Sequence, residues 1–158
     1  MTAFQENSVI DMENLTVSAF TKEDIPALAE IEREEFSIPF RENDFLDILN
    51  SEISSVLVAK LNGVVVGYVS FTVIQDECSI INFATKNEFK RQGVGKKVME
   101  ALLSHGSSLG VKKYFLEVRV SIAGAIALYE KYGFISVGIS KNHFLSPRED
   151  ALLMNLEL

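Results

Sequence analysis

The spacing of apolar positions predicts alternating strands and helices along the chain. Apolar and polar residues alternate over residues 15–20, as in a half-buried strand, whereas apolar residues recur at helical spacing over residues 25–36. Two further strand-like runs flank Asn62 and Gly63, a dipeptide that favours the type I′ turn of a β-hairpin. In chain order we expect strand 15–20, helices 25–36 and 42–50, strands 56–60, 64–74 and 77–85, helix 94–109, strand 113–120, helix 121–132, and strands 135–140 and 151–156.

This order of elements predicts an α/β fold with a mixed central sheet of about seven strands and about four flanking helices. Strands 77–85 and 113–120 should run parallel, because a helix joins them in a right-handed crossover, while most other neighbours should be antiparallel. Apolar residues on both faces of strand 113–120 indicate a central strand that is covered on both sides. A loop over residues 141–150 is expected to join the last two strands.

Length and composition indicate one ordinary globular domain. With 158 residues, 47% hydrophobic and 23% charged, the chain is long enough to bury a substantial core. We expect residues 1–14, which are polar and acidic, to form an N-terminal tail, and residues 15–158 to form the domain. The tail lacks the basic and apolar regions of a signal peptide, and no apolar run approaches the roughly 20 residues of a membrane span.

Net charge, cysteine content and histidine spacing indicate which partners, compartment and metal sites to expect. The formal net charge of −7 and the pI of about 4.9 argue against general nucleic-acid binding; they suit a basic partner, or simply solubility. The lone cysteine, Cys78, excludes an internal disulfide and is expected to be a small buried hydrophobe. It fits a reducing compartment, so we expect a cytoplasmic protein without membrane or direct nucleic-acid contact. His105 and His143 lack metal-ligand spacing, and no metal site is expected.

The stretch Lys-Arg-Gln-Gly-Val-Gly-Lys, residues 90–96, stands between a predicted strand and a predicted helix. Two glycines one residue apart allow a backbone turn and a close approach to a ligand that side chains would block. The unpaired N–H groups and positive dipole end of the helix would point at that turn, and Lys90, Arg91 and Lys96 add full charges. This arrangement favours a phosphate-binding loop, although a Gly-x-Gly pair by itself is equally typical of an ordinary tight turn.

Charged residues interrupt the apolar strand 113–120. A carboxylate such as Glu117 in this strand needs a partner, water or a chemical role. The plain alternative is a neighbour pair of Glu117 and Arg119 at a solvated edge. Tyr129 and Tyr132 lie on the Ala-rich helix that follows, where an aromatic residue is more often part of the core.

Together these stretches resemble the GNAT superfamily of acyl-CoA-dependent N-acetyltransferases, and within it the bacterial enzymes that acetylate the alanine terminus of a ribosomal protein. The resemblance covers roughly residues 15–158. The glycine loop is typical of the whole superfamily, and the remaining stretches are more specific. They are residues 36–40, 67–69, 81–85, 116–121, 125–134 and 148–154.

The resemblance implies acetyl-CoA as co-substrate, held by the glycine loop and by two diverging strands. It implies that Glu117 accepts the proton of the attacking amine and that Tyr129 donates a proton to the departing thiolate, without a covalent enzyme intermediate. An amine attacks a thioester only as the free base, and a carboxylate on a partly desolvated strand could take its proton directly or through water. The implied CoA contacts are Phe83, Ala84 and Thr85 on the strand and Arg91, Gln92, Gly93, Val94, Gly95 and Lys96 in the loop.

Departures from the family pattern bear on both the cofactor and the acceptor. Ile122 stands where the family has an asparagine that contacts CoA, so that side-chain contact is lost. Asn142-His143-Phe144 stands where a pair of tyrosines is expected in the substrate loop, which leaves the acceptor open. The first hypothesis is acetylation of the N-terminal alanine of a small-subunit ribosomal protein, with a basic protein N-terminus as partner. The second is a GNAT enzyme for another amine, such as a small metabolite, a polyamine or a different protein. The third, a non-catalytic acyl-CoA-binding module, is disfavoured because both implied proton-transfer residues are present.

Overall fold

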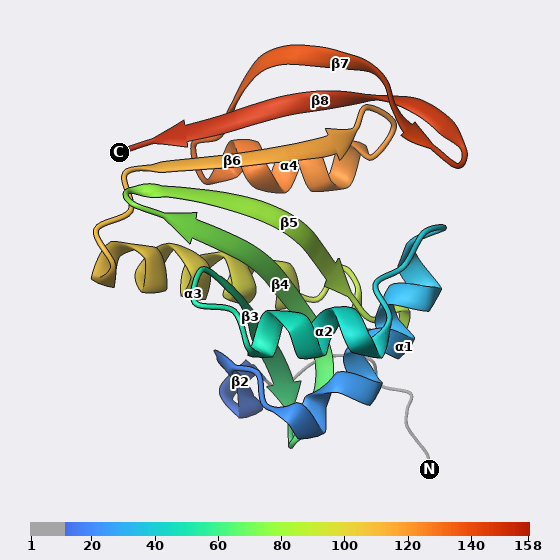
Figure 1. Cartoon of the computed structure of the whole chain (residues 1–158), viewed down its shortest axis with the longest axis vertical. Coiled ribbons are helices and arrows are strands. Elements are labelled where there is room, and N and C mark those ends of the chain that lie inside the picture. The colour runs from blue at the N-terminus through green and yellow to red at the C-terminus, as the bar shows by residue number, and fades with distance from the viewer. Residues whose placement is uncertain (1–11) are drawn as a thin grey trace.

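One seven-stranded mixed sheet runs through the protein, whose computed structural model describes residues 12–158 (Figure 1). The strand order is β2-β3-β4-β5-β6-β8-β7, and within the described residues only β5 and β6 pair in parallel. The predicted mixed sheet with a parallel crossover is therefore confirmed. The strands are β2 (Leu15–Ala19), β3 (Ser54–Leu61), β4 (Val64–Ile74), β5 (Glu77–Thr85), β6 (Lys113–Arg119), β7 (Ile135–Leu145) and β8 (Arg148–Glu157); the α-helices are α1 (Ile25–Glu35), α2 (Glu42–Leu49), α3 (Val94–Ser108) and α4 (Ala123–Lys131).

The β3–β4 hairpin turns where the sequence predicts. Asn62 and Gly63 have φ of 51° and 85°, the positive values that a type I′ turn requires at both central positions. The predicted N-terminal tail, residues 1–14, lies mostly outside the described residues, and its last three, Met12–Asn14, form a short 3-10 helix. No helix in residues 12–158 is long and apolar enough to cross a lipid bilayer.

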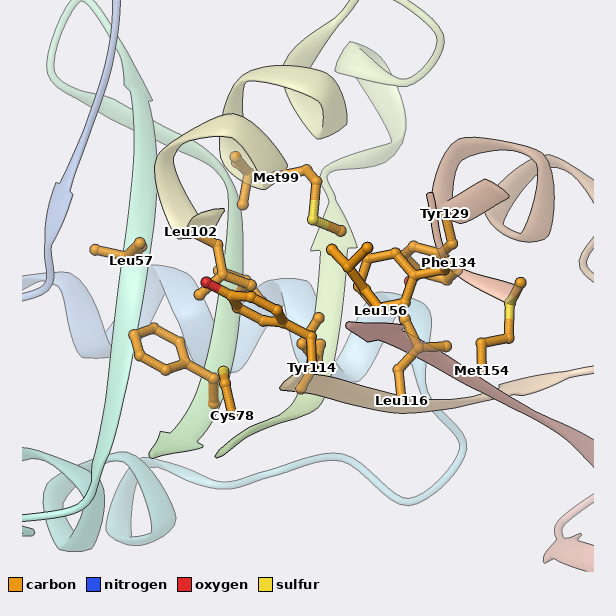
Figure 2. Packing of buried hydrophobic residues seen from close by; sticks show 14 of the residues in the cluster. Leu57, Cys78, Met99, Leu102, Tyr114, Leu116, Tyr129, Phe134, Met154 and Leu156 are labelled. Carbon is orange, nitrogen blue, oxygen red and sulfur yellow. The ribbon is translucent and has the colours of Figure 1, made fainter. Parts of the chain in front are cut away.

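Helices cover both faces of the sheet and create two apolar cores. Along β3, Val56 and Val58 face α1 and α2, whereas the alternate residues Leu57 and Ala59 face α3. The core on the α3 side continues to α4 and includes the buried thiol of Cys78, as predicted (Figure 2). Because side chains alternate between the two faces of a strand, α1 and α2 pack on one face of the sheet and α3 and α4 pack on the other.

Two apolar residues at helix ends are exposed. The helix predicted over residues 94–109 ends at Ser108, and Leu109 is 51% exposed. The backbone leaves helical geometry at Gly110, which has φ of 78°, so the last apolar residue turns away from the sheet. Leu49, the last residue of α2, is likewise 38% exposed.

The last hairpin is longer than predicted. β7 and β8 are joined only by Ser146 and Pro147, so the expected loop over residues 141–150 is wrong. β7 is an edge strand whose residues are mostly exposed on both faces. It therefore lacks the alternation that marks a half-buried strand in a sequence.

β6 is central in the sheet but is covered on only one face. Tyr114, Leu116 and Val118 are buried on the side of α3 and α4, whereas Glu117 on the other face is exposed. The prediction that both faces are covered is wrong, because α1 and α2 pack on β3, β4 and β5 rather than on β6. We call the side of β6 that carries Glu117 the open face.

A buried carboxylate ties α1 to the sheet and to the α1–α2 connection. Glu32 is fully buried, and its Oε1 accepts a hydrogen bond from the Phe40 N–H at 2.7 Å. Its Oε2 accepts hydrogen bonds from Asn82 Nδ2 at 2.9 Å and from the Tyr68 hydroxyl. Burial raises the pKa of Glu32 from 4.5 to about 7, although these hydrogen bonds favour the charged form.

This raised pKa predicts a pH dependence of stability. Between about pH 4.5 and 7 the unfolded chain loses the Glu32 proton before the folded protein does, so the free energy of unfolding decreases as pH rises through this window. Glu32→Gln should remove this contribution, which urea unfolding at about pH 5 and pH 7.5 would measure. Glu30→Gln, an exposed change on the same helix, is the control. An unchanged pH dependence in Glu32→Gln would contradict the prediction.

Candidate active site

The glycine loop, residues 90–96, places two residues of left-handed conformation before α3. Arg91 has φ of 63°, and Gly93, the N-cap residue, has φ of 96°. Left-handed residues among ordinary ones turn successive N–H groups toward one side, as in anion-binding nests. Within the described chain no acceptor bonds the main-chain N–H groups of residues 92–96. These groups, at the positive end of α3, are free to bind an anionic ligand.

Gly95 allows α3 to lie close to two neighbouring elements. A Cβ atom at this position would lie 3.3 Å from Cδ2 of Leu128 on α4 and 3.5 Å from Cε1 of Phe83 on β5. A larger side chain would push against both residues. The second glycine of the loop thus serves internal packing as well as the open approach that the sequence predicts.

The positive charges of the loop are not all free. Lys90 Nζ lies 2.8 Å from Glu35 Oε1 on α1, so the expectation that Lys90 adds a full charge to the loop is corrected. Arg91 and Lys96 are exposed and form no ion pair within residues 12–158. Both remain available to a ligand beside the free N–H groups.

β5 and β6 diverge, and we call the place where their pairing stops the slot. Their ladder joins residues 77–79 to residues 113–115 and then stops, although both strands continue. A bulge at this point places one extra residue, Ile81, in β5 opposite β4 and bends β5. Residues 83–85 still pair with β4 but have no strand partner on their other edge among the described residues. The divergence implied by the resemblance is confirmed, and it leaves a backbone edge on which an extended ligand can pair.

Glu117 lies on the open face of β6, past the point where the two strands part. Its side chain is 49% exposed, so about half of it is shielded from solvent. Its Oε2 lies 3.2 Å from Nε2 of His143 on β7. Arg119, the neighbour expected in the plain alternative, pairs instead with Glu149 at 3.2 Å. Glu117 therefore faces a histidine on one side and solvent on the other.

Tyr129 lies on α4 at the other side of the slot. Its ring is 6% exposed and packs edge-to-face on Phe83 of β5, with 5.9 Å between ring centroids. Burial raises the pKa of Tyr129 to about 12, so the phenol keeps its proton at neutral pH and can donate it. Tyr132 instead donates its hydroxyl to Glu100 Oε2 at 3.0 Å. No hydrogen bond within the described residues joins Glu117 to Tyr129.

Two contacts near the open face were missed from the sequence. One is the approach of His143 to Glu117, and the other is the hydrogen bond from the Ser37 hydroxyl to the Ser146 carbonyl oxygen. The second contact joins the α1–α2 connection to the β7–β8 turn. Both join segments far apart in the chain, so no local spacing signals them. Residues 142–144 depart from the family pattern, but the sequence does not indicate which residues they contact.

These features together can position an anionic thioester ligand and an amine. The free N–H groups and cations suit a pyrophosphate, the free edge of β5 suits an amide-containing arm, and the open face offers a carboxylate to an amine. Among residues 12–158, no three His, Cys, Asp or Glu side chains gather so that they could hold a metal ion.

Comparisons with known proteins give both a family and a fold. The model of the acetyltransferase (GNAT) family matches residues 25–134. Over 145 residues the chain is 32% identical to the ribosomal protein bS18-alanine N-acetyltransferase of Escherichia coli (strain K12), covering 90% of this chain and 97% of that enzyme. The crystal structure of the ribosomal-protein-S18-alanine N-acetyltransferase from Escherichia coli has a TM-score of 0.83 at 33% identity, covering 90% and 93% of the two chains. Arabidopsis thaliana NAA60 in complex with acetyl-CoA shares the fold, with a TM-score of 0.82 at 14% identity and coverage of 91% and 98%.

Proposed function

Because the chain belongs to the acetyltransferase (GNAT) family, we propose that it transfers the acetyl group of acetyl-CoA to the N-terminal alanine amine of a small-subunit ribosomal protein. The observation that carries the proposal is Glu117 on the open face, past the divergence of β5 and β6. The choice of acceptor is supported by the similarity of the whole chain, which is 32% identical to a bS18-alanine enzyme over 97% of that enzyme.

Acetyl-CoA is the proposed co-substrate, and the residues present fit it. The N–H groups of residues 92–96 would take the pyrophosphate, with Arg91 and Lys96 adding charge. The free edge of residues 83–85 would pair with the pantetheine arm inside the slot. The solved relative NAA60 was crystallised with acetyl-CoA, which supports this use of the shared fold.

The proposed reaction is one direct acetyl transfer to the amine, assisted by two residues that exchange protons with the reactants. Bound acetyl-CoA supplies an activated thioester. Glu117 takes one proton from the amine as its nitrogen bonds to the carbonyl carbon, and Tyr129 gives its phenolic proton to the sulfur as the carbon–sulfur bond breaks. The phenol of Tyr129 carries its proton across the neutral range, as a proton donor must.

An α-amine suits this site better than a lysine amine. An α-amine titrates near pH 8 and is partly neutral at physiological pH, whereas a lysine amine titrates near 10.4. A carboxylate in contact with solvent is a modest base. Such a base is sufficient for an α-amine, which is already partly neutral, and less suited to a lysine amine. The net charge of −7 also favours a basic peptide over an acidic one.

The acceptor prediction is tested with one peptide that carries both kinds of amine. We expect mass spectrometry of a basic peptide with an N-terminal alanine and an internal lysine to show acetylation mainly at the terminus. The rate should fall as added salt screens the attraction. The same peptide with a blocked terminus is the control. Modification mainly at the lysine, or none while a small amine is acetylated well, would replace the proposal with a GNAT enzyme for another amine, which the departure at residues 142–144 keeps open.

A further inference from the structure

His143 is held in a fixed orientation beside Glu117. Its Nε2 lies 3.2 Å from Glu117 Oε2, and its Nδ1 shares a hydrogen bond of 3.2 Å with the Ser140 hydroxyl. The imidazole ring also packs edge-to-face on Phe144, with 4.9 Å between ring centroids. Both ring nitrogens thus have partners. The serine hydroxyl can donate to a neutral Nδ1 or accept from a protonated one, so it supports either state of the ring.

A bulge in β7 turns His143 toward β6. Ser140 pairs with Ala151 and Phe144 with Glu149, so residues 141–143 stand opposite a single residue of β8, Asp150. Within the bulge, Asn142 has φ of 51° and donates its N–H to Asp150 Oδ1 at 2.8 Å. Bulges bend a strand and re-aim its side chains, commonly beside active sites. In a regular ladder, residues 141–143 would each pair with a separate residue of β8.

The other charged groups nearby are engaged elsewhere. Arg119 stacks on the Phe144 ring at 4.4 Å and pairs with Glu149 at 3.2 Å, while Asp150 accepts the main-chain N–H of the bulge. Glu117 is therefore the one carboxylate within the described residues that lies within 4 Å of a His143 ring nitrogen.

We propose that His143 is a positioning residue for Glu117: the imidazole holds Oε2 and leaves Oε1 to take the amine proton. This inference rests on the proposed role of Glu117 as base. Glu117 is half exposed, and without a partner its side chain would be free to change rotamer on the open face. Bound acceptor and acetyl-CoA would exclude water from this face, and the contact between imidazole and carboxylate strengthens as water leaves.

The test compares two replacements of the histidine. His143→Phe keeps an aromatic ring but removes the contact, whereas His143→Gln keeps an N–H donor near the position of Nε2 and cannot gain charge. With whichever amine is acetylated fastest, His143→Phe should lower kcat about tenfold, the loss expected for a hydrogen bond to a charged group. KM for acetyl-CoA should stay within about twofold. His143→Gln should recover most of kcat, because its side-chain N–H can still donate to Oε2.

A double variant separates this inference from the proposed function. The double variant Glu117→Gln with His143→Phe should be no slower than Glu117→Gln alone, because His143 acts only through the Glu117 carboxylate that is already lost. The pair is partly exposed and contributes little to stability, so His143→Phe should unfold at the wild-type temperature. A wild-type kcat in His143→Phe, or additive losses in the double variant, overturns the positioning role while leaving Glu117 as base. A wild-type kcat in Glu117→Gln overturns the role of Glu117 and with it this inference.

Discussion

Replacing Glu117 by glutamine is expected to lower turnover by about 100-fold or more, the range for loss of a general base. Glutamine keeps the shape of the side chain but accepts no proton from the amine. Acetyl-CoA affinity should change little, because the proposed contacts of the cofactor lie on the glycine loop and on β5. The side chain is 49% exposed, so the variant should fold normally. Release of CoA at saturating substrates measures turnover, and calorimetric titration measures affinity.

Glu157→Gln is the matched control for this prediction. Glu157 is also an exposed carboxylate with one basic partner, Lys113 at 3.9 Å, but it lies at the end of β8 away from the slot. Its replacement removes the same charge and should leave turnover near wild type. If both glutamine variants kept wild-type turnover, Glu117 would not be the base, and water or another group would have to take the proton.

Replacing Tyr129 by phenylalanine is expected to lower turnover by a similar factor, about 100-fold or more. Phenylalanine keeps the ring against Phe83 and Phe134, so the core beside the slot should be retained. What is lost is the phenolic proton, which the raised pKa keeps in place across the neutral range. Without it, the departing thiolate has no donor from α4. Single-turnover rates would show whether the loss lies in the chemical step.

Tyr132→Phe provides the comparison on the same helix. Tyr132 also loses only a hydroxyl, and that hydroxyl bonds Glu100 Oε2 at 3.0 Å and the Lys96 carbonyl oxygen at 3.4 Å, both on α3. We expect Tyr132→Phe to keep turnover within about twofold of wild type. Equal losses in the two variants would assign the effect to packing of α4, and a loss confined to Tyr132→Phe would exchange the two assignments.

Most of the secondary structure could be predicted because it depends on neighbours in the chain. The β3–β4 turn follows from Asn62 and Gly63, which adopt positive φ at little cost, and the start of α3 follows from Gly93 before it. The parallel pairing of β5 with β6 follows from the single helix between them. The two proton-transfer candidates came from the family resemblance, whereas spacing alone also allowed a core tyrosine and a surface ion pair.

The length of β7 and the exposure of β6 could not be predicted, for different reasons. An edge strand that is exposed on both faces carries no alternation, and three residues of β7 bulge out of the ladder, so residues 141–145 resembled a polar loop. The apolar residues of β6 indicated burial on both faces, but α1 and α2 pack on other strands. Coverage of a strand depends on where distant helices pack, which its own residues do not specify.

The sequence by itself determined the order of the elements, the crossover, the glycine loop and the candidate pair Glu117 and Tyr129, because each rests on a local pattern or a shared motif. Only the tertiary structure decided which groups meet around them. The bulge at Ile81 accompanies the opening of the slot, Glu35 pairs with Lys90, and His143 lies against Glu117. Each of these contacts joins residues from different elements. They form only when the sheet twists, bulges and packs as a whole, and no spacing within one segment encodes that arrangement.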